Sequence, residues 1–373
     1  MQKYLIKILI ILTVFSSWTF AQTSKFRIKD LTPLFGENKF PNIISETNPK
    51  VAEKINIFLQ LENLNLLPGV YKTHPFEKVA PDEKNCCAST EFYEWKQYKT
   101  PNTILSLQLT GEATGAYPEG FENYYNFDLQ TGNPILLGDI FSAQGLAKID
   151  ETTGRRIRNE INAYLRKLRQ ELKSPRLKKE AKDDLREKES MYQSCVESIG
   201  KGDLKDYEYY FSNQSITFIK GRCSPHALRA IDDLWEFENK FSYKEIENYL
   251  TNYGKSLMKG TKFSYLSATP EAKLFKGKIN GKLPITAIIT KVYEDSSLTM
   301  QYWYNSQKTP IELNGNFKDN HFTLVENDYH DEEKAEWIPK ANIQADWINN
   351  NKIIGTWTNY KTKEVFKFEL ETY

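Results

Sequence analysis

The pattern of the sequence changes near residue 265, and this change constrains the fold more than any other feature. Before it, apolar residues recur with helical spacing over long segments, whereas after it they alternate in short runs typical of strands. Turn pairs such as Asn280-Gly281 and Asn314-Gly315 separate several of these runs. Strands are predicted at residues 272–279, 283–293, 297–304, 310–317, 321–326, 343–348, 352–359 and 364–370. Short strands at this density predict a small closed or nearly closed antiparallel barrel, with the acidic segment 328–340 as an exposed loop.

Residues 103–141 carry the clearest strand signal of the first part of the chain. Leu105, Leu107 and Leu109 alternate with more polar residues, which is the pattern of a strand with one buried face. A glycine-rich loop is predicted over residues 111–120, followed by a second run at 124–129. Asp128 and Gly132 suit a tight turn after that run, because Asp bonds its own backbone and Gly tolerates positive φ.

Helical patterns surround this strand pair. Asn48 and Pro49 predict the start of a helix over residues 50–62, and apolar spacing predicts a long helix over 149–172 and a more charged one ending near residue 192. Further strands are expected at 91–99 and 207–220. The fold class is therefore α+β: an antiparallel sheet packed by helices, followed by a small all-β antiparallel barrel. We expect the domains to be 22–262, which could divide into 22–100 and 101–262, and 263–373.

The first 21 residues have the features of a secretory signal peptide. Lys3 and Lys7 precede an apolar run, and small residues before Gln22 predict cleavage after Ala21. An uncleaved membrane anchor is the alternative, but the run is shorter than the roughly 20 residues that a spanning helix needs. We expect a soluble protein, exported through the Sec route to the periplasm or the medium, with no stable membrane insertion after cleavage.

Charge gives no sign of a nucleic-acid partner. Lys and Arg total 50 and Asp and Glu total 49, so the net charge of +1 creates no global field that recruits nucleic acid or anionic membranes. Basic residues do gather on the long helices, at Arg155, Arg156, Arg158, Arg166, Lys167 and Arg169. Acidic residues intersperse along the same helices, which favours a solvated, salt-bridged surface.

The chain has four cysteines, at positions 86, 87, 195 and 223. Exported proteins fold in oxidising compartments, so disulfides are expected. Adjacent cysteines bridge each other only with strain, and Cys86 and Cys87 are therefore predicted to pair with Cys195 and Cys223, in an order left open. Free thiols and a metal site are the alternatives, although the spacing fits no zinc pattern.

Two blocks together resemble a known family. Residues 40–44 and 49–56 precede the strand at 105–107, the hairpin Phe127-Asp128 … Thr131-Gly132 and residues 139–141. Over roughly residues 28–258 the chain resembles the paired extracytoplasmic domains of unknown function found in a lysozyme-sensing anti-sigma factor and as accessory regions of some bacterial peptidoglycan deacetylases. The resemblance implies an antiparallel sheet packed by helices and a ligand- or protein-binding role. Nothing here corresponds to the sensor's membrane span and sigma-binding part or to the deacetylases' catalytic domain, so neither activity is carried over.

The last part of the chain has a resemblance of its own. Residues 275–277, 302–304, 311–315 and 355–357 look like the small β domains common on exported proteins of the Bacteroidetes type. This resemblance implies a β-barrel and no activity.

The common catalytic motifs are missing from the sequence. It contains no Gly-x-Ser-x-Gly elbow, no His-Glu-x-x-His and no phosphate-binding glycine loop. A Cys223–His226 nucleophile is conceivable at a helix start, but a disulfide cysteine beside a surface histidine is favoured. Asp128 and Asp139 are interpreted as turn and cap residues. We predict no catalytic residues, no metal ligands and no cofactor.

Binding is the function that remains. Tyr117 and Phe121 on the predicted glycine-rich loop, and Trp303 and Trp357 on the barrel, are the candidate binding residues, although an aromatic core role competes for the tryptophans. We expect a non-enzymatic exported protein that binds an envelope component, such as a glycan, or an extracellular protein such as a lysozyme-like enzyme. The alternative is a hydrolase or transferase that acts on envelope glycans through acidic residues between the domains.

Overall fold

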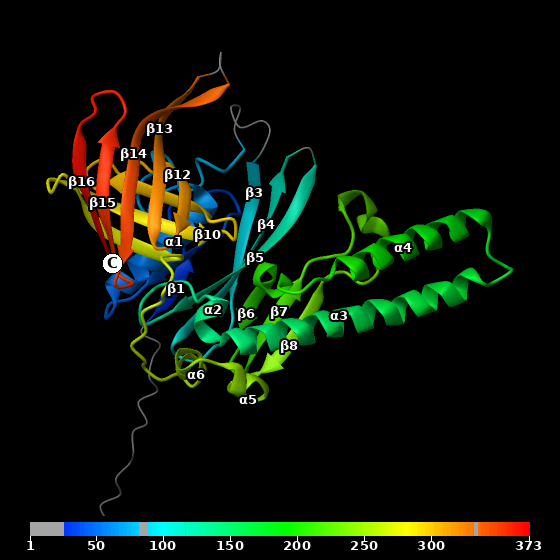
Figure 1. The fold of residues 1–373 in the computed structure, drawn as a ribbon. Coiled ribbons are helices and arrows are strands. Elements are labelled where there is room, and N and C mark those ends of the chain that lie inside the picture. The colour runs from blue at the N-terminus through cyan, green and yellow to red at the C-terminus, as the bar shows by residue number, and fades with distance from the viewer. Residues whose placement is uncertain (1–25, 82–88, 116, 332–334) are drawn as a thin grey trace, which may run out of the picture.

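The structure is a computed structural model that describes residues 26–81, 89–115, 117–331 and 335–373 (Figure 1). The predicted signal peptide, its cleavage site between Ala21 and Gln22, and the pair Cys86 and Cys87 lie outside the described residues. The fold class is confirmed, because helices and antiparallel sheets are followed by a closed antiparallel barrel. Within the described part of the chain, no helix combines the length and the apolar character that crossing a membrane requires.

The first part packs one helix between a small ribbon and a three-stranded sheet. Strands β1 (Arg27–Asp30) and β2 (Pro41–Ile44) pair, and α1 (Pro49–Leu64) follows. The sheet has the order β3 (Ser89–Gln97), β4 (Ile104–Thr114) and β5 (Pro118–Asp128). The side chain of Asn56 on α1 bonds both the N–H and the C=O of Ile43, at 2.8 Å each, which fixes the ribbon on the helix.

The predicted loop at residues 111–120 is wrong. Strands β4 and β5 pair from Ile104–Asp128 through Thr114–Pro118, so the hairpin continues to its tip. Gly111 lies opposite Phe121, and a Cβ on Gly111 would come within 2.5 Å of the Phe121 ring. This glycine therefore makes room for an aromatic ring on the next strand rather than marking a loop.

The second part consists of a second small sheet and a helical arm. The sheet has the order β6 (Glu208–Phe211), β7 (Ser215–Lys220) and β8 (Phe237–Ser242). Short helices follow or precede it: α2 (Leu137–Ile140), η1 (Asp203–Asp206), η2 (His226–Ile231), α5 (Tyr243–Ile246), η3 (Glu247–Tyr249) and α6 (Asn252–Met258). The capping side chain of Ser242 accepts from the Glu245 N–H, which starts α5.

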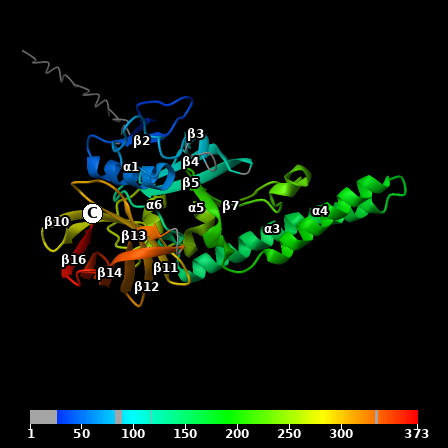
Figure 2. The same ribbon diagram turned by 90° about the horizontal axis from the view of Figure 1, so that it is seen from above.

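The arm is an antiparallel pair of helices that projects from the body, as both views show (Figures 1 and 2). It consists of α3 (Ala143–Leu172) and α4 (Lys179–Ser198), whose contact is apolar through Ile157, Ile161 and Met191. A disulfide joins Cys195 on α4 to Cys223. The predicted pairing of Cys86 and Cys87 with these two cysteines is therefore wrong, because the fold brings α4 directly against the segment after β7.

The last part is a closed eight-stranded barrel. Its strands are β9 (Lys273–Ile279), β10 (Leu283–Val292), β11 (Ser297–Tyr304), β12 (Ile311–Lys318), β13 (His321–Asp331), β14 (Glu336–Ile348), β15 (Lys352–Asn359) and β16 (Val365–Thr372). They pair in sequence order, and β9 closes the barrel by pairing with both β10 and β16. The predicted loop at 328–340 is wrong, because β13 continues past a register shift near Asn327 and pairs with β14 as far as Asp331–Glu336.

Barrel and first part share an apolar contact. Ile57, Leu61 and Leu67 of the first part pack against Leu274, Ile288 and Trp303 on the outside of the barrel. Figure 2 shows the first part and the barrel side by side, with the arm directed away from both. The division into domains at residues 262–263 stays a prediction.

Candidate functional site

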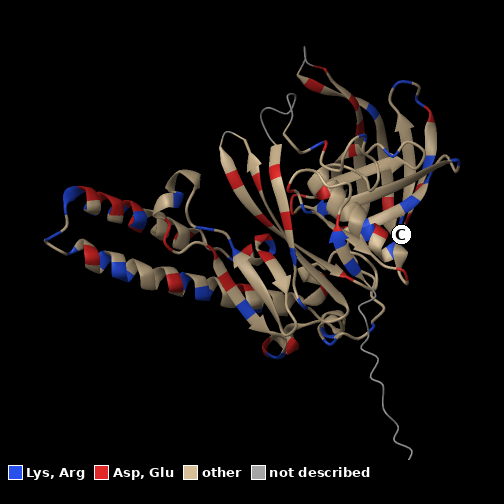
Figure 3. Ribbon diagram, turned by 180° about the vertical axis from the view of Figure 1, so that it is seen from behind, with Lys and Arg blue, Asp and Glu red and all other residues tan. Residues whose placement is uncertain are grey.

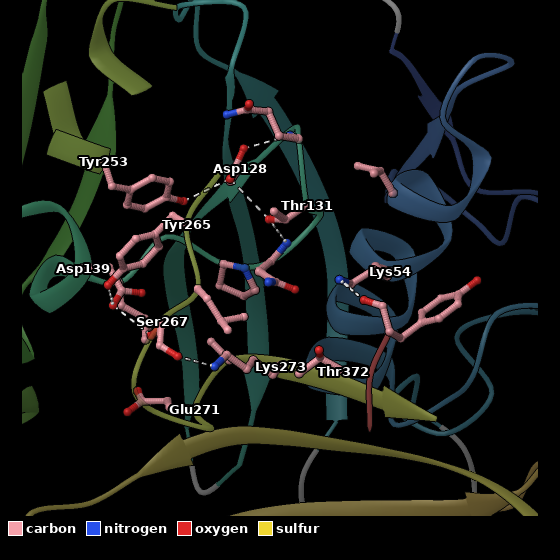
Figure 4. Close-up of a pocket in the computed structure, with 18 of the residues that line it drawn as sticks. Lys54, Asp128, Thr131, Asp139, Tyr253, Tyr265, Ser267, Glu271, Lys273 and Thr372 are labelled. Atoms are coloured by element: carbon pink, nitrogen blue, oxygen red, sulfur yellow. Dashed lines mark hydrogen bonds between the residues drawn. The ribbon is translucent and has the colours of Figure 1, made fainter. Parts of the chain in front are cut away.

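A cavity of about 380 Å³ lies where the first part, the second part and the barrel meet. Its walls come from α1, the turn after β5, α2, α6, the segment before β9 and the end of β16 (Figure 4). The charged residues among its lining are Lys50, Lys54, Asp128, Asp139, Glu271 and Lys273. This volume is within the range of small-molecule sites in proteins.

Asp128 and the turn after it form one wall. The Asp128 carboxylate accepts from the Gln130 N–H at 2.8 Å and from the Thr131 hydroxyl at 3.3 Å, so its predicted role in the turn is confirmed. Gly132 has φ of 77°, and a Cβ there would meet the main-chain oxygen of Val51 at 2.9 Å. Gly132, which follows Thr131 in the turn after β5, therefore lets this turn pack closely against α1, the helix that carries Lys54.

Two stacked tyrosines hold the second wall. The rings of Tyr253 and Tyr265 lie 4.3 Å apart. The Tyr253 hydroxyl donates to Asp128 at 3.0 Å and the Tyr265 hydroxyl donates to Asp139 at 2.8 Å. Burial, and to a smaller extent the hydrogen bond with Asp139, raises the pKa of Tyr265 to about 12. Burial also raises the pKa of Tyr253, so both tyrosines are neutral hydrogen-bond donors.

Lys54 enters the cavity from α1 (Figure 4). It is only 7% exposed, and among the described residues its ammonium donates a single hydrogen bond, of 2.6 Å, to the main-chain oxygen of Tyr373. Burial lowers its pKa to about 8, against the opposing attraction of Asp128. An ammonium has three N–H donors, so two are left for a ligand in the described structure.

Lys273 reaches the same cavity from β9. It is 4% exposed and donates to the main-chain oxygen of Ser267 at 2.8 Å. Burial lowers its pKa to about 8; the charge of Asp139 opposes this effect, and the charge of Lys54 adds to it. The positive charge of Lys54 therefore acts on Lys273 across the cavity that both side chains line.

The carboxylates of the cavity are engaged differently from the lysines. Asp128 and Asp139 each accept at least two hydrogen bonds from the chain, and burial raises the pKa of Asp128. Burial also raises the pKa of Glu271. These groups hold the walls together, whereas the lysines retain unused donors. The arrangement is chemically suited to receive an anion between two ammonium groups.

The hairpin residues predicted to bind lie elsewhere. Tyr117 is 69% exposed at the tip of the β4–β5 hairpin and stacks on His226 at 5.5 Å between ring centroids. Phe121 is partly buried, and its ring packs edge-on against Tyr93. Tyr117 is therefore available to a partner, while Phe121 supports the hairpin.

Both tryptophans that the sequence offers as candidate binding residues on the barrel are buried. Trp303 points outward and is 4% exposed, because α1 covers it. Trp357 points inward and is 6% exposed, and its indole N–H donates to Glu326 at 2.8 Å. The strand alternation was correct, but both faces of the barrel are occupied at these positions.

Histidine and cysteine chemistry is absent from the cavity. Cys223 is held in its disulfide, so the Cys223–His226 nucleophile is ruled out. His74 stacks on Phe35, and His321 bonds Asp346 at 2.7 Å on the barrel. In the described ranges, no group of three or more His, Cys, Asp or Glu is placed to hold a metal ion.

The sequence did not reveal the two lysines. Lys54 occupies a helix position among apolar residues, and Lys273 opens a strand, and lysine is common at both kinds of position. One signal was present: Lys54 falls between Val51 and Ile55, two of the apolar residues of the predicted helix over 50–62. Their meeting depends on the packing of α1 against the barrel, which no local pattern shows.

Comparison with known proteins adds fold-level similarity. No protein-family model matches the sequence, and no curated protein matches it. One similar solved structure is a member of the DUF3298 family from Bacteroides fragilis, with 15% identity, 63% of this chain and 97% of that chain covered, and a TM-score of 0.37. Another is a DUF3298 family protein from Pseudomonas aeruginosa, with 10% identity, coverage of 61% and 94%, and a TM-score of 0.29.

Proposed function

We propose that the protein is an exported binding protein that holds an anionic group of an envelope component between Lys54 and Lys273. One observation carries this proposal: two buried lysines, whose pKa values burial lowers to about 8, line the same cavity, and neither forms an ion pair with an Asp or Glu side chain in the described structure; Lys54 donates to the main-chain oxygen of Tyr373 and Lys273 to that of Ser267. Burying such charges destabilises the fold unless a ligand compensates. A bound anion would remove that cost.

Export is supported by two features. The predicted signal peptide directs the chain out of the cytoplasm, and the Cys195–Cys223 disulfide is typical of an oxidising compartment. Acidic sugars and acidic peptides are then the natural ligands, because envelope polymers carry carboxylates and phosphates. A single acidic sugar fits a cavity of this volume.

The proposal is tested with two sugars that differ by one lactyl ether group, which carries the carboxylate of the acidic sugar. N-acetylmuramic acid and N-acetylglucosamine are titrated into the chain from Gln22 onward at pH 7 by isothermal calorimetry. We expect the acidic sugar to bind at least tenfold more tightly than the neutral one. Equal affinities, or no binding of the acidic sugar, would contradict the proposal.

Substitution of each lysine tests whether the sugar binds in this cavity. Lys54→Met and Lys273→Met should each reduce the affinity for the acidic sugar at least tenfold, because each removes a charge-assisted bond. Lys282→Met is the matched control, since Lys282 is an exposed turn residue of the barrel. An equal loss in the control would show that net charge, rather than the cavity, decides the affinity.

A glycan hydrolase or transferase is the second candidate, since Asp128, Asp139 and Glu271 line the same cavity and burial raises the pKa of Asp128 and Glu271. A carboxyl with a raised pKa is the usual general acid of such enzymes. This candidate predicts release of reducing sugar from isolated peptidoglycan and its loss in Glu271→Gln. The binding proposal predicts no release, and an affinity for the acidic sugar that is retained in that variant.

A further inference from the structure

The far end of the helical arm carries a cluster of positive charges. Four of the seven residues from position 173 to 179 are basic, all four are exposed, and no acidic residue lies between them. These residues, the basic tip, are Lys173, Arg176, Lys178 and Lys179. Figure 3 shows Lys and Arg gathered at the far end of the arm, where the chain turns from α3 into α4. Charges of both signs are mixed along the rest of the two helices.

The charges of the basic tip are not neutralised by the chain. In the described structure, none of the four forms a salt bridge, whereas some basic residues elsewhere on the two helices do: Arg169 pairs with Glu189 at 2.6 Å and Lys188 with Asp233 at 2.6 Å. The sequence favours a salt-bridged surface along these helices, and the ion pairs of Arg169 and Lys188 agree with this expectation. Over residues 173–179, by contrast, basic residues outnumber acidic ones by four to none, and all four basic side chains are exposed to solvent.

The arm is built to hold this tip away from the body. Helix α3 has 30 residues, which corresponds to a length of about 45 Å. The Cys195–Cys223 disulfide fastens the base of α4, and the buried hydroxyl of Tyr192 donates to Asp232 at 2.6 Å. A rigid support of this kind fixes the direction in which the basic tip is presented.

We propose that the basic tip docks on the surface of an anionic phospholipid membrane. Each Lys or Arg near such a surface strengthens binding about fivefold, and a cluster of four is enough for measurable, reversible attachment. A flat anionic surface suits an exposed cluster of charges at the end of an arm, because it requires no shaped pocket. The contact is electrostatic, so no part of the arm inserts into the bilayer.

The test is co-sedimentation with vesicles. The chain from Gln22 onward, which retains every described residue, is mixed with vesicles of 30% phosphatidylglycerol and 70% phosphatidylethanolamine, or of pure phosphatidylcholine, at 50 mM and 500 mM NaCl. We expect binding to the anionic vesicles at low salt, at least tenfold weaker binding at high salt, and none to the zwitterionic vesicles. No binding to the anionic vesicles, or equal binding to both kinds, would overturn the proposal.

Two quadruple variants separate the tip from the net charge. The tip variant is Lys173→Gln, Arg176→Gln, Lys178→Gln and Lys179→Gln. The control has the same charge change far from the tip: Arg155→Gln, Lys201→Gln, Lys244→Gln and Lys262→Gln, all at exposed positions. The tip variant should bind anionic vesicles at least tenfold more weakly than the native chain, and the control should bind as the native chain does. Retained binding in the tip variant, or an equal loss in the control, overturns the proposal.

Discussion

Glu326 and Lys54 are both buried charged side chains, but their surroundings differ. Glu326 lies inside the barrel, whereas Lys54 lines the cavity where the barrel meets the first and second parts of the chain. Glu326 is fully buried and accepts from Tyr302 at 2.7 Å, Lys340 at 2.6 Å and Trp357 at 2.8 Å. In the described structure Lys54 donates one hydrogen bond, to the main-chain oxygen of Tyr373, and burial lowers its pKa to about 8. A buried charge whose bonds are complete supports the fold, whereas one with unused donors costs stability and is expected where a ligand supplies the rest.

The largest effect is expected for Glu326→Ala. The change leaves the Tyr302 hydroxyl and the Trp357 N–H buried without an acceptor and deprives Lys340 of its counter-charge. Breaking such a buried pair costs about 3–5 kcal/mol, and the partial exposure of Lys340 places the expected loss near the lower end, about 3 kcal/mol. Urea denaturation measures it.

The matched control is Glu369→Ala. Glu369 forms an ion pair with Lys367 at 2.7 Å on the exposed face of the same barrel. Exposed pairs contribute little, so the loss should stay within about 0.5 kcal/mol. If Glu326→Ala cost no more than this control, the interpretation of the Glu326 cluster as a structural support would fail.

The second-largest effect is the pH dependence that Lys54 gives to the free energy of unfolding. Its pKa is about 8 in the folded protein and 10.5 by reference, so between these values the unfolded chain binds more protons. The free energy of unfolding therefore rises with pH across this window, by about 2 kcal/mol from pH 7 to pH 9.5 for this one group.

The measurement compares the native chain with Lys54→Met at both pH values. Groups that do not interact with Lys54 titrate alike in both proteins and cancel in the difference between them, whereas Lys273, whose pKa the charge of Lys54 lowers, cancels only in part. Native stability should gain about 2 kcal/mol relative to the variant on going from pH 7 to pH 9.5. A difference that does not change with pH would mean that Lys54 is well solvated, and the contrast with Glu326 would disappear.

A smaller effect is expected for Tyr253→Phe. The change removes one hydrogen bond to the buried carboxylate of Asp128 and keeps the ring that stacks on Tyr265. The expected loss is about 1.5 kcal/mol in the free energy of unfolding, with affinity for the acidic sugar unchanged. A tenfold loss of affinity without a loss of stability would move Asp128 from the support of the cavity to its binding groups.

The smallest effect on stability is expected for Tyr117→Ala. The ring is mostly exposed, so the free energy of unfolding should change by less than about 0.5 kcal/mol, and binding of the acidic sugar should be unaffected. A pull-down of lysozyme and of envelope fractions by the native chain and by this variant examines the hairpin tip separately. Retention that is the same in both would remove Tyr117 from consideration as a binding residue.

The barrel could be predicted from the sequence because its signal is local. Alternation and turn pairs lie within a few residues of each other, and strands 297–304 and 352–359 were placed with correct bounds. The failures at 111–120 and 328–340 share one cause: glycine and acidic residues suggest loops, while pairing across a hairpin overrides this preference. Gly111 is there because Phe121 needs the space.

The cavity could be predicted only in part. Asp128 was recognised as a turn residue from its own segment, and that role is real. Lys54, Tyr253 and Lys273 line the same cavity but lie 74, 125 and 145 positions from Asp128 in the sequence, and local sequence patterns carry no information at that range. The same limit applies to the tryptophans: strand alternation places Trp303 and Tyr302 on opposite faces of the barrel, but it does not show which face is outside or that α1 covers Trp303.

Proton uptake on binding tests the central claim most directly. At pH 8, Lys54 and Lys273 are each about half protonated, and an anion bound between them raises both pKa values. Titration of N-acetylmuramic acid by calorimetry in buffers of different ionisation enthalpy gives the number of protons taken up. We predict about one proton per sugar bound at pH 8, falling to nearly none at pH 6. Binding without proton uptake at pH 8 would contradict the assignment of this cavity as the anion site.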